Sequence, residues 1–495
     1  MKKDLQFIKE IQKEIILLGH IGALLNWDQQ TYMPKKASKE RAEQSAHLSL
    51  LVHEKLISNE LFDSLNRLKN YNLSSDDKIM VNKLYKDVLK LRKLPKEFVT
   101  EMSKATSLGF DAWQKSREKK DFKIFQPYLE KIIKLKRQET KYLGFKNHPY
   151  DSLLDYYEEG MTAEELKKKF EKIKPKLLDL IHKIKDSKKY KTQNLVLMRK
   201  NFPREDQIEL TKDVTKKMGL EETNFRIDLS EHPFTTKIGF NDVRITTNIR
   251  DKPLFAFEST IHEAGHALYE LGCPEKHKFD VLGETPSLGI HESQSRFWEN
   301  MIGKSKPFWK YYFKLFDKKF KLGNFEEWYF ELNQINPSPI RIESDELHYC
   351  LHVILRFELE LSLIDGSIEV KDLPKLWNKK MKEYIGIMPK NDVEGVLQDV
   401  HWSGGNIGYF PTYAIGTIYA SQLYKRLKSK NKNLEKDISK GDFTKITKWL
   451  KVNIHQHGRK FLAEEIIKKA TGEGLNIETY LDYLTKKYTS LYELN

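Results

Sequence analysis

The stretch 261–270 constrains this chain most, because it places His262, Glu263 and His266 in the pattern HExxH. Apolar residues around them recur at helical spacing, and Gly272 predicts the end of the helix. Residues four apart on a helix share one face, with about 5–6 Å between their Cβ atoms, so both imidazoles can reach one metal ion. Glu263 can then serve as general base toward a water molecule. The alternative is a surface helix with two histidines by coincidence.

A third metal ligand is expected from another element, because catalytic zinc sites usually have three protein ligands and one open position. Glu292, at the start of the next helical pattern, is our prediction, since the intervening loop lets a second helix pack across the first. An ordinary first-turn glutamate, favoured by the helix dipole, is the alternative. We predict one divalent metal ion per chain, with zinc as the default, although cobalt or manganese fits the same ligands.

Helical periodicity dominates the remaining sequence, and strand-like alternation is convincing only between residues 224 and 250, directly before the HExxH helix. We therefore predict a mainly α fold with a small β-sheet next to that helix. Its strands can align a peptide by backbone hydrogen bonds, or they can simply close the core. Without a linker signal, residues 1–495 are predicted to form one domain, in which 1–190 is a lysine-rich helical subdomain and 191–495 carries the sheet and the site.

The formal net charge of +15, from 86 Lys and Arg against 71 Asp and Glu, raises the possibility of a nucleic-acid-binding protein with a vestigial site. The excess lysines are spread through helical segments such as 167–176 and 183–191. No nucleic-acid-binding motif accompanies them, so solvated helix faces are the favoured interpretation. We expect no nucleic-acid partner.

Two cysteines, Cys273 and Cys350, cannot build a disulfide framework and are typical of a reducing compartment. The N-terminus is charged where a signal peptide needs an apolar run, and the apolar stretch 15–25 is too short to span a bilayer. We predict a cytoplasmic protein without a membrane partner.

Six motifs then occur in order. They are HPF at 232–234, DVRIT at 242–246, HEAGH at 262–266, HESQ at 291–294, IRIESD at 340–345 and GVLQDVHW at 395–402. Together with WDQ at 27–29 and GYFPTY at 408–413, they resemble the metallocarboxypeptidases of the carboxypeptidase Taq type over nearly the whole chain. One departure is Ser344, which stands where that family usually has alanine, and which leaves Arg341 and Asp345 in place.

This resemblance implies a large helical metallopeptidase fold with a deep central groove. It also implies an enzyme that releases single amino acids from peptides with a free C-terminus, with broad specificity and as a homodimer. In the matching motifs, His262, His266 and Glu292 are implied to bind the metal, and Glu263 is implied to be the general base. An endo-acting metallo-oligopeptidase of similar helical fold is the alternative, since it would share the metal site.

The resemblance further implies that Arg341 recognises the terminal carboxylate, which a guanidinium fork matches with two hydrogen bonds. The alternative is a structural ion pair with Asp345, four residues later. His401, Tyr409 and Tyr413 are candidates for stabilising the negative charge that develops on the peptide carbonyl. They could equally be core residues with a hydrogen-bonded tip.

His232, Asp242 and Arg244 belong to motifs that the resemblance places at the border of the groove, where they limit its length. Asp242 and Arg244 alternate on one strand face, so a plain ion pair on the sheet is the alternative. We expect all three to contribute to substrate binding.

Overall fold

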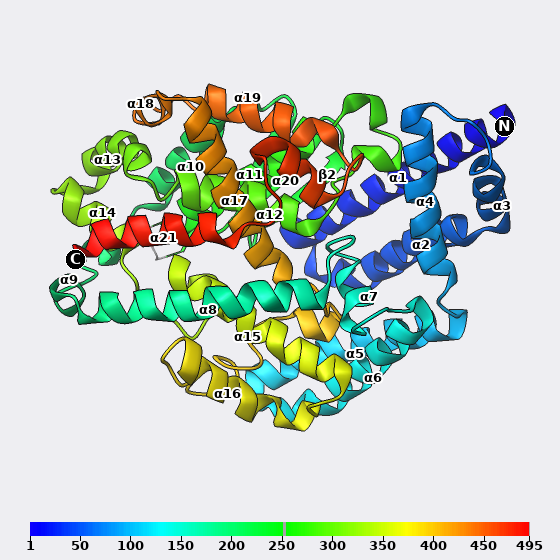
Figure 1. Ribbon diagram of the computed structural model, residues 1–495, viewed down its shortest axis with the longest axis horizontal. Coiled ribbons are helices and arrows are strands. Elements are labelled where there is room, and N and C mark those ends of the chain that lie inside the picture. The colour runs from blue at the N-terminus through cyan, green and yellow to red at the C-terminus, as the bar shows by residue number, and fades with distance from the viewer. Residues whose placement is uncertain (251–253, 495) are drawn as a thin grey trace.

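The computed structural model describes residues 1–250 and 254–494, and it is built mainly of helices (Figure 1). The helices before the sheet are α1 (Lys2–Thr31), α2 (Ser38–Ile57), α3 (Asn59–Leu68), α4 (Ser75–Arg92), α5 (Lys96–Lys119), α6 (Gln126–Leu143), α7 (Tyr150–Leu154), α8 (Ala163–Asp186), α9 (Lys188–Lys191) and α10 (Arg204–Met218). Those after it are α11 (Phe255–Gly272), α12 (Leu288–Arg296), α13 (Lys306–Phe320), α14 (Phe325–Asn333), α15 (Glu346–Asp365), α16 (Leu373–Tyr384), α17 (Pro411–Lys430), α18 (Leu434–Ile438), α19 (Thr444–Asn453), α20 (Ala463–Thr471) and α21 (Ile477–Tyr492). The predicted mainly α class is confirmed.

Helix α8 shows how local sequence defines these elements. The Thr162 hydroxyl accepts from the Glu165 N–H, and the Glu165 carboxylate accepts from the Thr162 N–H, which closes a capping box. The buried stripe of α8 then packs on α15, where the rings of Phe170 and Phe357 meet edge to face at 5.1 Å. Figure 1 shows α8 running along the molecule below α21.

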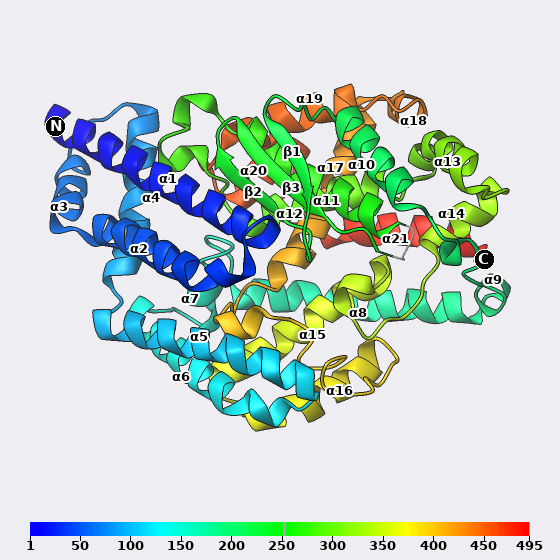
Figure 2. The same cartoon turned by 180° about the vertical axis from the view of Figure 1, so that it is seen from behind.

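Within the described residues there is one sheet, made of β1 (Phe225–Leu229), β2 (Thr235–Gly239) and β3 (Asp242–Thr247) in the order β1–β3–β2. β3 is central, parallel to β1 and antiparallel to β2, and its Val243 and Ile245 are buried on the side of α11. Figure 2 shows α1 lying beside β2, one of the two edge strands. The prediction of a small sheet next to the HExxH helix is confirmed.

Two glycines allow α12 to lie unusually close to its neighbours. A Cβ on Gly265 of α11 would fall 2.7 Å from the carbonyl oxygen of Gln294 in α12. A Cβ on Gly416 of α17 would fall 2.7 Å from the Cβ of Glu292. Side chains cannot approach that closely, so glycine at both positions lets α12 be clamped between α11 and α17. This clamp holds Glu292 opposite the two histidines of α11.

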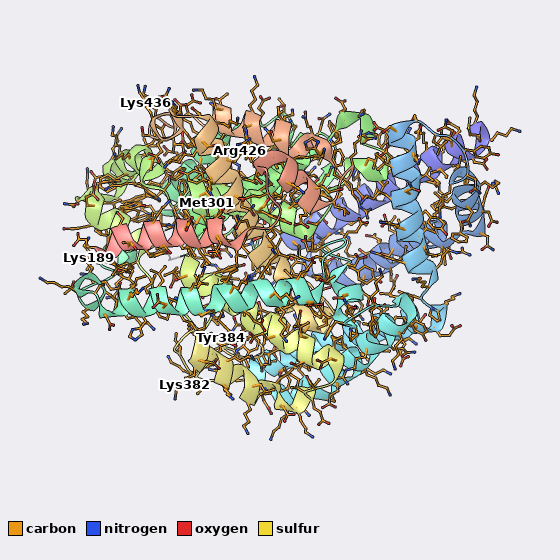
Figure 3. The ribbon with its side chains drawn as sticks, viewed as in Figure 1. Lys189, Met301, Lys382, Tyr384, Arg426 and Lys436 are labelled. Carbon is orange, nitrogen blue, oxygen red and sulfur yellow. The ribbon has the colours of Figure 1, made fainter. Side chains whose placement is uncertain are left out.

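The surface carries the basic charge that the composition indicated. Lys382 and Lys436 are exposed at the periphery, whereas Met301 lies in the interior (Figure 3). None of the helices in the described part of the chain combines the length and the apolar character that a membrane crossing requires.

Candidate active site

A cavity of about 880 Å³ is lined by His262, Glu263 and Glu292, and also by Arg341 and Tyr413. Its walls therefore combine the HExxH helix α11, helix α12 and the chain segments around residues 341 and 413. The space is of the size that proteins use to enclose small ligands. The expected groove thus exists, and it brings several of the predicted site residues together.

The three predicted ligand residues converge at this cavity. Nε2 of His266 lies 3.5 Å, and Nε2 of His262 4.0 Å, from Oε2 of Glu292. One ligand atom from each residue lies within 4.8 Å of the other two. Two imidazole nitrogens and one carboxylate oxygen form a set that zinc and similar divalent ions accept, with an open position for water. The residues present therefore fit a metal ion.

Electrostatics around these ligands favour a cation. Burial alone would lower the pKa of His262, but the carboxylates of Glu292 and Glu299 raise it to about 9. Burial would raise the pKa of Glu299, yet the charge of Arg296 and the hydrogen bond from His262 bring it down to about 2. The carboxylates thus stay ionised and favour positive charge at His262, whereas burial lowers the pKa of His266. A divalent ion would satisfy the negative charge of the carboxylates.

Sequence reasoning missed two residues that support the predicted ligand residues. Glu299, in the π-helix η6 (Phe297–Ile302), accepts a hydrogen bond at 2.7 Å from Nδ1 of His262. Arg296 donates from Nε to Oε1 of Glu292 at 2.8 Å and from Nη1 to Glu299 at 3.1 Å. A carboxylate behind a histidine ligand fixes its ring orientation. The usable sequence signal was the spacing, because Arg296 follows Glu292 by one helical turn.

Glu263 is positioned by the neighbouring sheet. The hydroxyl of Thr235, the first residue of β2, donates to Oε2 of Glu263 at 2.6 Å. It also lies 3.1 Å from the backbone carbonyl oxygen of the same residue. One carboxylate oxygen of Glu263 is therefore held by the protein, and Glu263 itself lines the cavity. Thr235 is a contact that HExxH gives no means of predicting.

Arg341, in the short helix η7 (Arg341–Glu343), is buried and pairs with Asp399. Its Nη2 lies 3.0 Å from Oδ1 of Asp399, and its Nη1 donates to the Tyr349 hydroxyl at 3.0 Å. The alternative partner, Asp345, instead accepts from His348 at 2.8 Å and caps α15. Arg341 thus faces the cavity with its orientation fixed by neighbours other than the one that the spacing suggested.

The candidates for charge stabilisation form one aromatic cluster. Nε2 of His401 lies 3.2 Å from the Tyr413 hydroxyl, and the ring of Tyr409 lies 5.0 Å from that of His401. Burial lowers the pKa of His401 to about 4, so its imidazole is neutral at neutral pH. Nδ1 of His401 is buried without a hydrogen-bond partner in the described structure. Of the three, Tyr413 lines the cavity.

The three residues expected at the groove border lie on the sheet side. Arg244 makes a two-pronged ion pair with Asp242, at 2.8 and 2.7 Å, and stacks over Trp27 of α1 at 4.5 Å. His232 is exposed in the loop between β1 and β2. Among the described residues that line the cavity, Pro233 is the nearest in sequence to His232. The ion pair considered for Asp242 and Arg244 is present, and their substrate role stays a prediction.

Taken together, a helix-borne HExxH pair, a glutamate from a second helix and a buried arginine around one cavity define a metal-dependent hydrolase. Comparison with known proteins identifies the family to which this hydrolase belongs. The family model described as carboxypeptidase Taq (M32) metallopeptidase matches residues 7–488. This chain belongs to that family, and it is accordingly a metallocarboxypeptidase that depends on a divalent metal ion and acts on peptides.

Relatives match over nearly their full length. Thermostable carboxypeptidase 1 of Pyrococcus furiosus is 39% identical over 482 residues, which is 96% of each chain. Carboxypeptidase 1 of Bacillus subtilis is 38% identical over 496 residues, 98% of each chain. A solved structure of the Pyrococcus furiosus carboxypeptidase superimposes with a TM-score of 0.95 at 37% identity, covering 99% of both chains. The fold expected from the motifs is therefore confirmed.

Proposed function

We propose that this enzyme removes single amino acids from the free C-terminus of peptides, with broad specificity, using zinc held by His262, His266 and Glu292. The observation that carries the proposal is the shared cavity. It brings a fitting ligand set, the carboxylate of Glu263 and the guanidinium of Arg341 together in one space. An endopeptidase would need the first two but would have no use for a buried cation beyond the scissile bond.

When bound, the metal ion would polarise the scissile carbonyl and acidify a water molecule. Glu263 takes a proton from that water through its carboxylate, whose orientation Thr235 maintains. As the water oxygen bonds to the carbonyl carbon and the C–N bond breaks, Glu263 gives the proton to the departing amine. Arg341 holds the terminal carboxylate, which fixes the bond to be cleaved at one residue from the end.

Tyr413, Tyr409 and His401 are proposed to stabilise the developing oxyanion as one cluster, in which Tyr413 is the residue that lines the cavity. A neutral His401 that carries its proton on Nε2 donates to the Tyr413 hydroxyl, so the hydroxyl hydrogen is not used toward His401 and can point at the substrate. The opposite tautomer would leave an N–H group without a partner at the buried Nδ1, which costs more than an unused lone pair. On the sheet side, His232, Asp242 and Arg244 are proposed to limit the groove.

Two substitutions test the core of this proposal. Glu263→Gln should keep a full complement of metal while turnover of an N-terminally blocked peptide is lost, because the amide cannot take a proton. His266→Ala should lose the metal, measured as ions per chain in purified protein. Near-normal activity in the first variant, or unchanged metal content in the second, would contradict the assigned roles. Metal content of protein from its native source identifies the ion.

The end of the substrate is tested with one peptide in two forms. The free-acid form should be shortened one residue at a time, whereas the form with a C-terminal amide should resist, because it offers Arg341 no charge. Internal cleavage of the amidated peptide would favour the endo-acting alternative. A gel shift with nucleic acid by metal-free protein would favour the binding-protein alternative.

We also propose a homodimer. Leu17, Ile21 and Leu24 of α1 are 43, 49 and 40% exposed and follow one another at helical spacing, which gives an apolar face suited to a partner chain. Sedimentation of wild type and of Ile21→Glu tests this, with a monomer expected for the variant. A reducing, cytoplasmic location is proposed because both cysteines, Cys273 and Cys350, are buried and free.

Residues 1–495 are proposed to act as one catalytic domain in which 1–190 is a lysine-rich subdomain along the groove. The main buried core supports this, since it includes α8 of the first part together with α11, α12 and α15 of the second. Expression of 191–495 alone should therefore give an insoluble or unfolded product.

A further inference from the structure

His266 is connected to a chain of three further polar side chains that runs away from the cavity. Its Nδ1 lies 2.6 Å from Nδ1 of His291, whose Nε2 lies 2.9 Å from Oε1 of Glu270. The other carboxylate oxygen of Glu270 lies 3.0 Å from the ammonium of Lys237. The chain thus joins α12, α11 and strand β2, and its four side chains are each about four-fifths buried or more.

The hydrogen-bonding rules of these groups allow one direction along the chain. An ammonium can only donate, so Lys237 holds Glu270 as an ionised acceptor. His291 must then donate from Nε2 to Glu270, which leaves its Nδ1 as an acceptor when the ring is neutral. His266 therefore donates from Nδ1, and the lone pair of its ring lies on Nε2. That is the atom that faces Glu292 at 3.5 Å.

We propose that Glu270 and His291 are positioning residues that set the tautomer of His266 so that Nε2 is available to the metal ion. This inference rests on the proposed function, because it takes His266 as a ligand. The companion ligand His262 differs, since its Nδ1 meets the carboxylate of Glu299 directly. A carboxylate accepts in any case, whereas a histidine accepts in only one tautomer. The tautomer of His266 is thereby fixed by Glu270, which is two contacts away along this chain.

Glu270→Gln tests the direction of the chain without changing its shape. The carbonyl oxygen of the new amide pairs with Lys237, so its NH₂ group points at Nε2 of His291. His291 then accepts at Nε2 and carries its proton on Nδ1, which forces His266 to move its own proton to Nε2. Metal affinity, measured by competition with a chelating dye, should fall about 10- to 100-fold, as for other outer-shell changes at metal sites.

A second substitution should restore what the first removes. In the double variant Lys237→Met with Glu270→Gln, no ammonium holds the amide oxygen, so the amide can turn and accept from His291. Metal affinity should return to within about threefold of wild type, a strong departure from additivity. Lys237→Met alone leaves Glu270 as an acceptor for His291 and should bind metal normally. A merely structural role would instead make the double variant at least as weak as Glu270→Gln.

Glu358→Gln is the matched control. Glu358 is 25% exposed, against 17% for Glu270, and it also pairs with a lysine, Lys174, at 2.8 Å. It should lower stability comparably and leave metal affinity unchanged. Imidazole ¹⁵N resonances of metal-free protein give a second readout, because a proton on Nδ1 of His266 in wild type should appear on Nε2 in Glu270→Gln.

The outcomes separate this inference from the proposed function. If His266→Ala retains the metal, His266 is not a ligand and the proposed function fails, and the inference fails with it. If His266→Ala loses the metal but Glu270→Gln binds it as wild type does, only the inference is overturned. A double variant that stays as weak as Glu270→Gln also overturns it, even when the single variant behaves as expected.

Discussion

Removing the hydroxyl of Thr235 should slow catalysis without disturbing the metal site. Thr235→Val keeps the shape of the side chain but deletes the 2.6 Å hydrogen bond to Oε2 of Glu263. A hydrogen bond to a charged group contributes about 1.5–3 kcal/mol. If that energy serves to hold the proposed general base in its reactive orientation, kcat should fall about 10- to 150-fold, at 1.36 kcal/mol for each factor of ten.

The assay follows kcat and KM on an N-terminally blocked peptide, together with the metal content of each preparation. Metal content and KM should stay close to wild type, because Thr235 touches neither a ligand residue nor Arg341 in the hydrogen bonds of the described structure. Thr235→Ser is the control and should retain most of the activity, since it keeps the hydroxyl. Wild-type kcat in Thr235→Val, or an equal loss in Thr235→Ser, would refute the reasoning.

Three further predictions concern packing, pH and substrate recognition. Gly416→Ala should lower Tm and weaken metal binding, because its Cβ would fall 2.7 Å from that of Glu292. Gly19→Ala is the control, because it lies in open surroundings and should leave metal binding and Tm unchanged or raise Tm slightly. Similar effects of the two substitutions would contradict the helix clamp. Burial lowers the pKa of His455 to about 3. Between pH 6.5 and 3 the unfolded chain therefore binds one more proton than the folded chain, and the stability of the wild type should decrease as the pH is lowered, by up to about 1.4 kcal/mol per pH unit. His455→Asn should flatten that slope in urea unfolding, and an identical slope in both proteins would count against the assignment. Arg341→Gln should raise KM for free-acid peptides about tenfold or more while the amidated peptide stays resistant, and an unchanged KM would remove Arg341 from substrate binding.

The catalytic helix was predictable because its information is local. The apolar spacing, the HExxH motif and the glycine that ends the helix all lie within 261–272, and α11 indeed ends at Gly272. The placement of Glu292 beside this helix was also predictable, because the intervening loop is long enough for the next helical segment to pack across α11. The ion-pair partner of Arg341 could not be predicted, because pairing between residues four apart assumes that both lie on one helix. Arg341 lies in η7, whereas Asp345 caps the helix that follows.

The supporting contacts of the site could not be read from spacing, because they depend on how the elements meet. Lys237 and Thr235 reach α11 only through the placement of β2 at the edge of the sheet. Likewise, nothing local marks Gly416 as the residue that lets α17 approach Glu292. Such residues can be identified only when the helices and strands that meet at the site have been placed, whereas motif residues can be identified from the sequence alone.

The charges around Arg341 support the proposal that this cavity binds a free C-terminus. Arg341 and Arg356 share one carboxylate, that of Asp399, at 3.0 Å to Arg341 and 2.7 Å to Nε of Arg356. Two guanidiniums share this one hydrogen-bonded carboxylate in a buried place, which favours the binding of a further anion. A peptide carboxylate supplies that anion, and a neutral peptide group of a longer chain does not. Asp399→Asn should therefore tighten the binding of small carboxylate inhibitors if the variant folds, whereas unchanged or weaker binding by a folded variant would mean that the excess charge is already balanced within the protein.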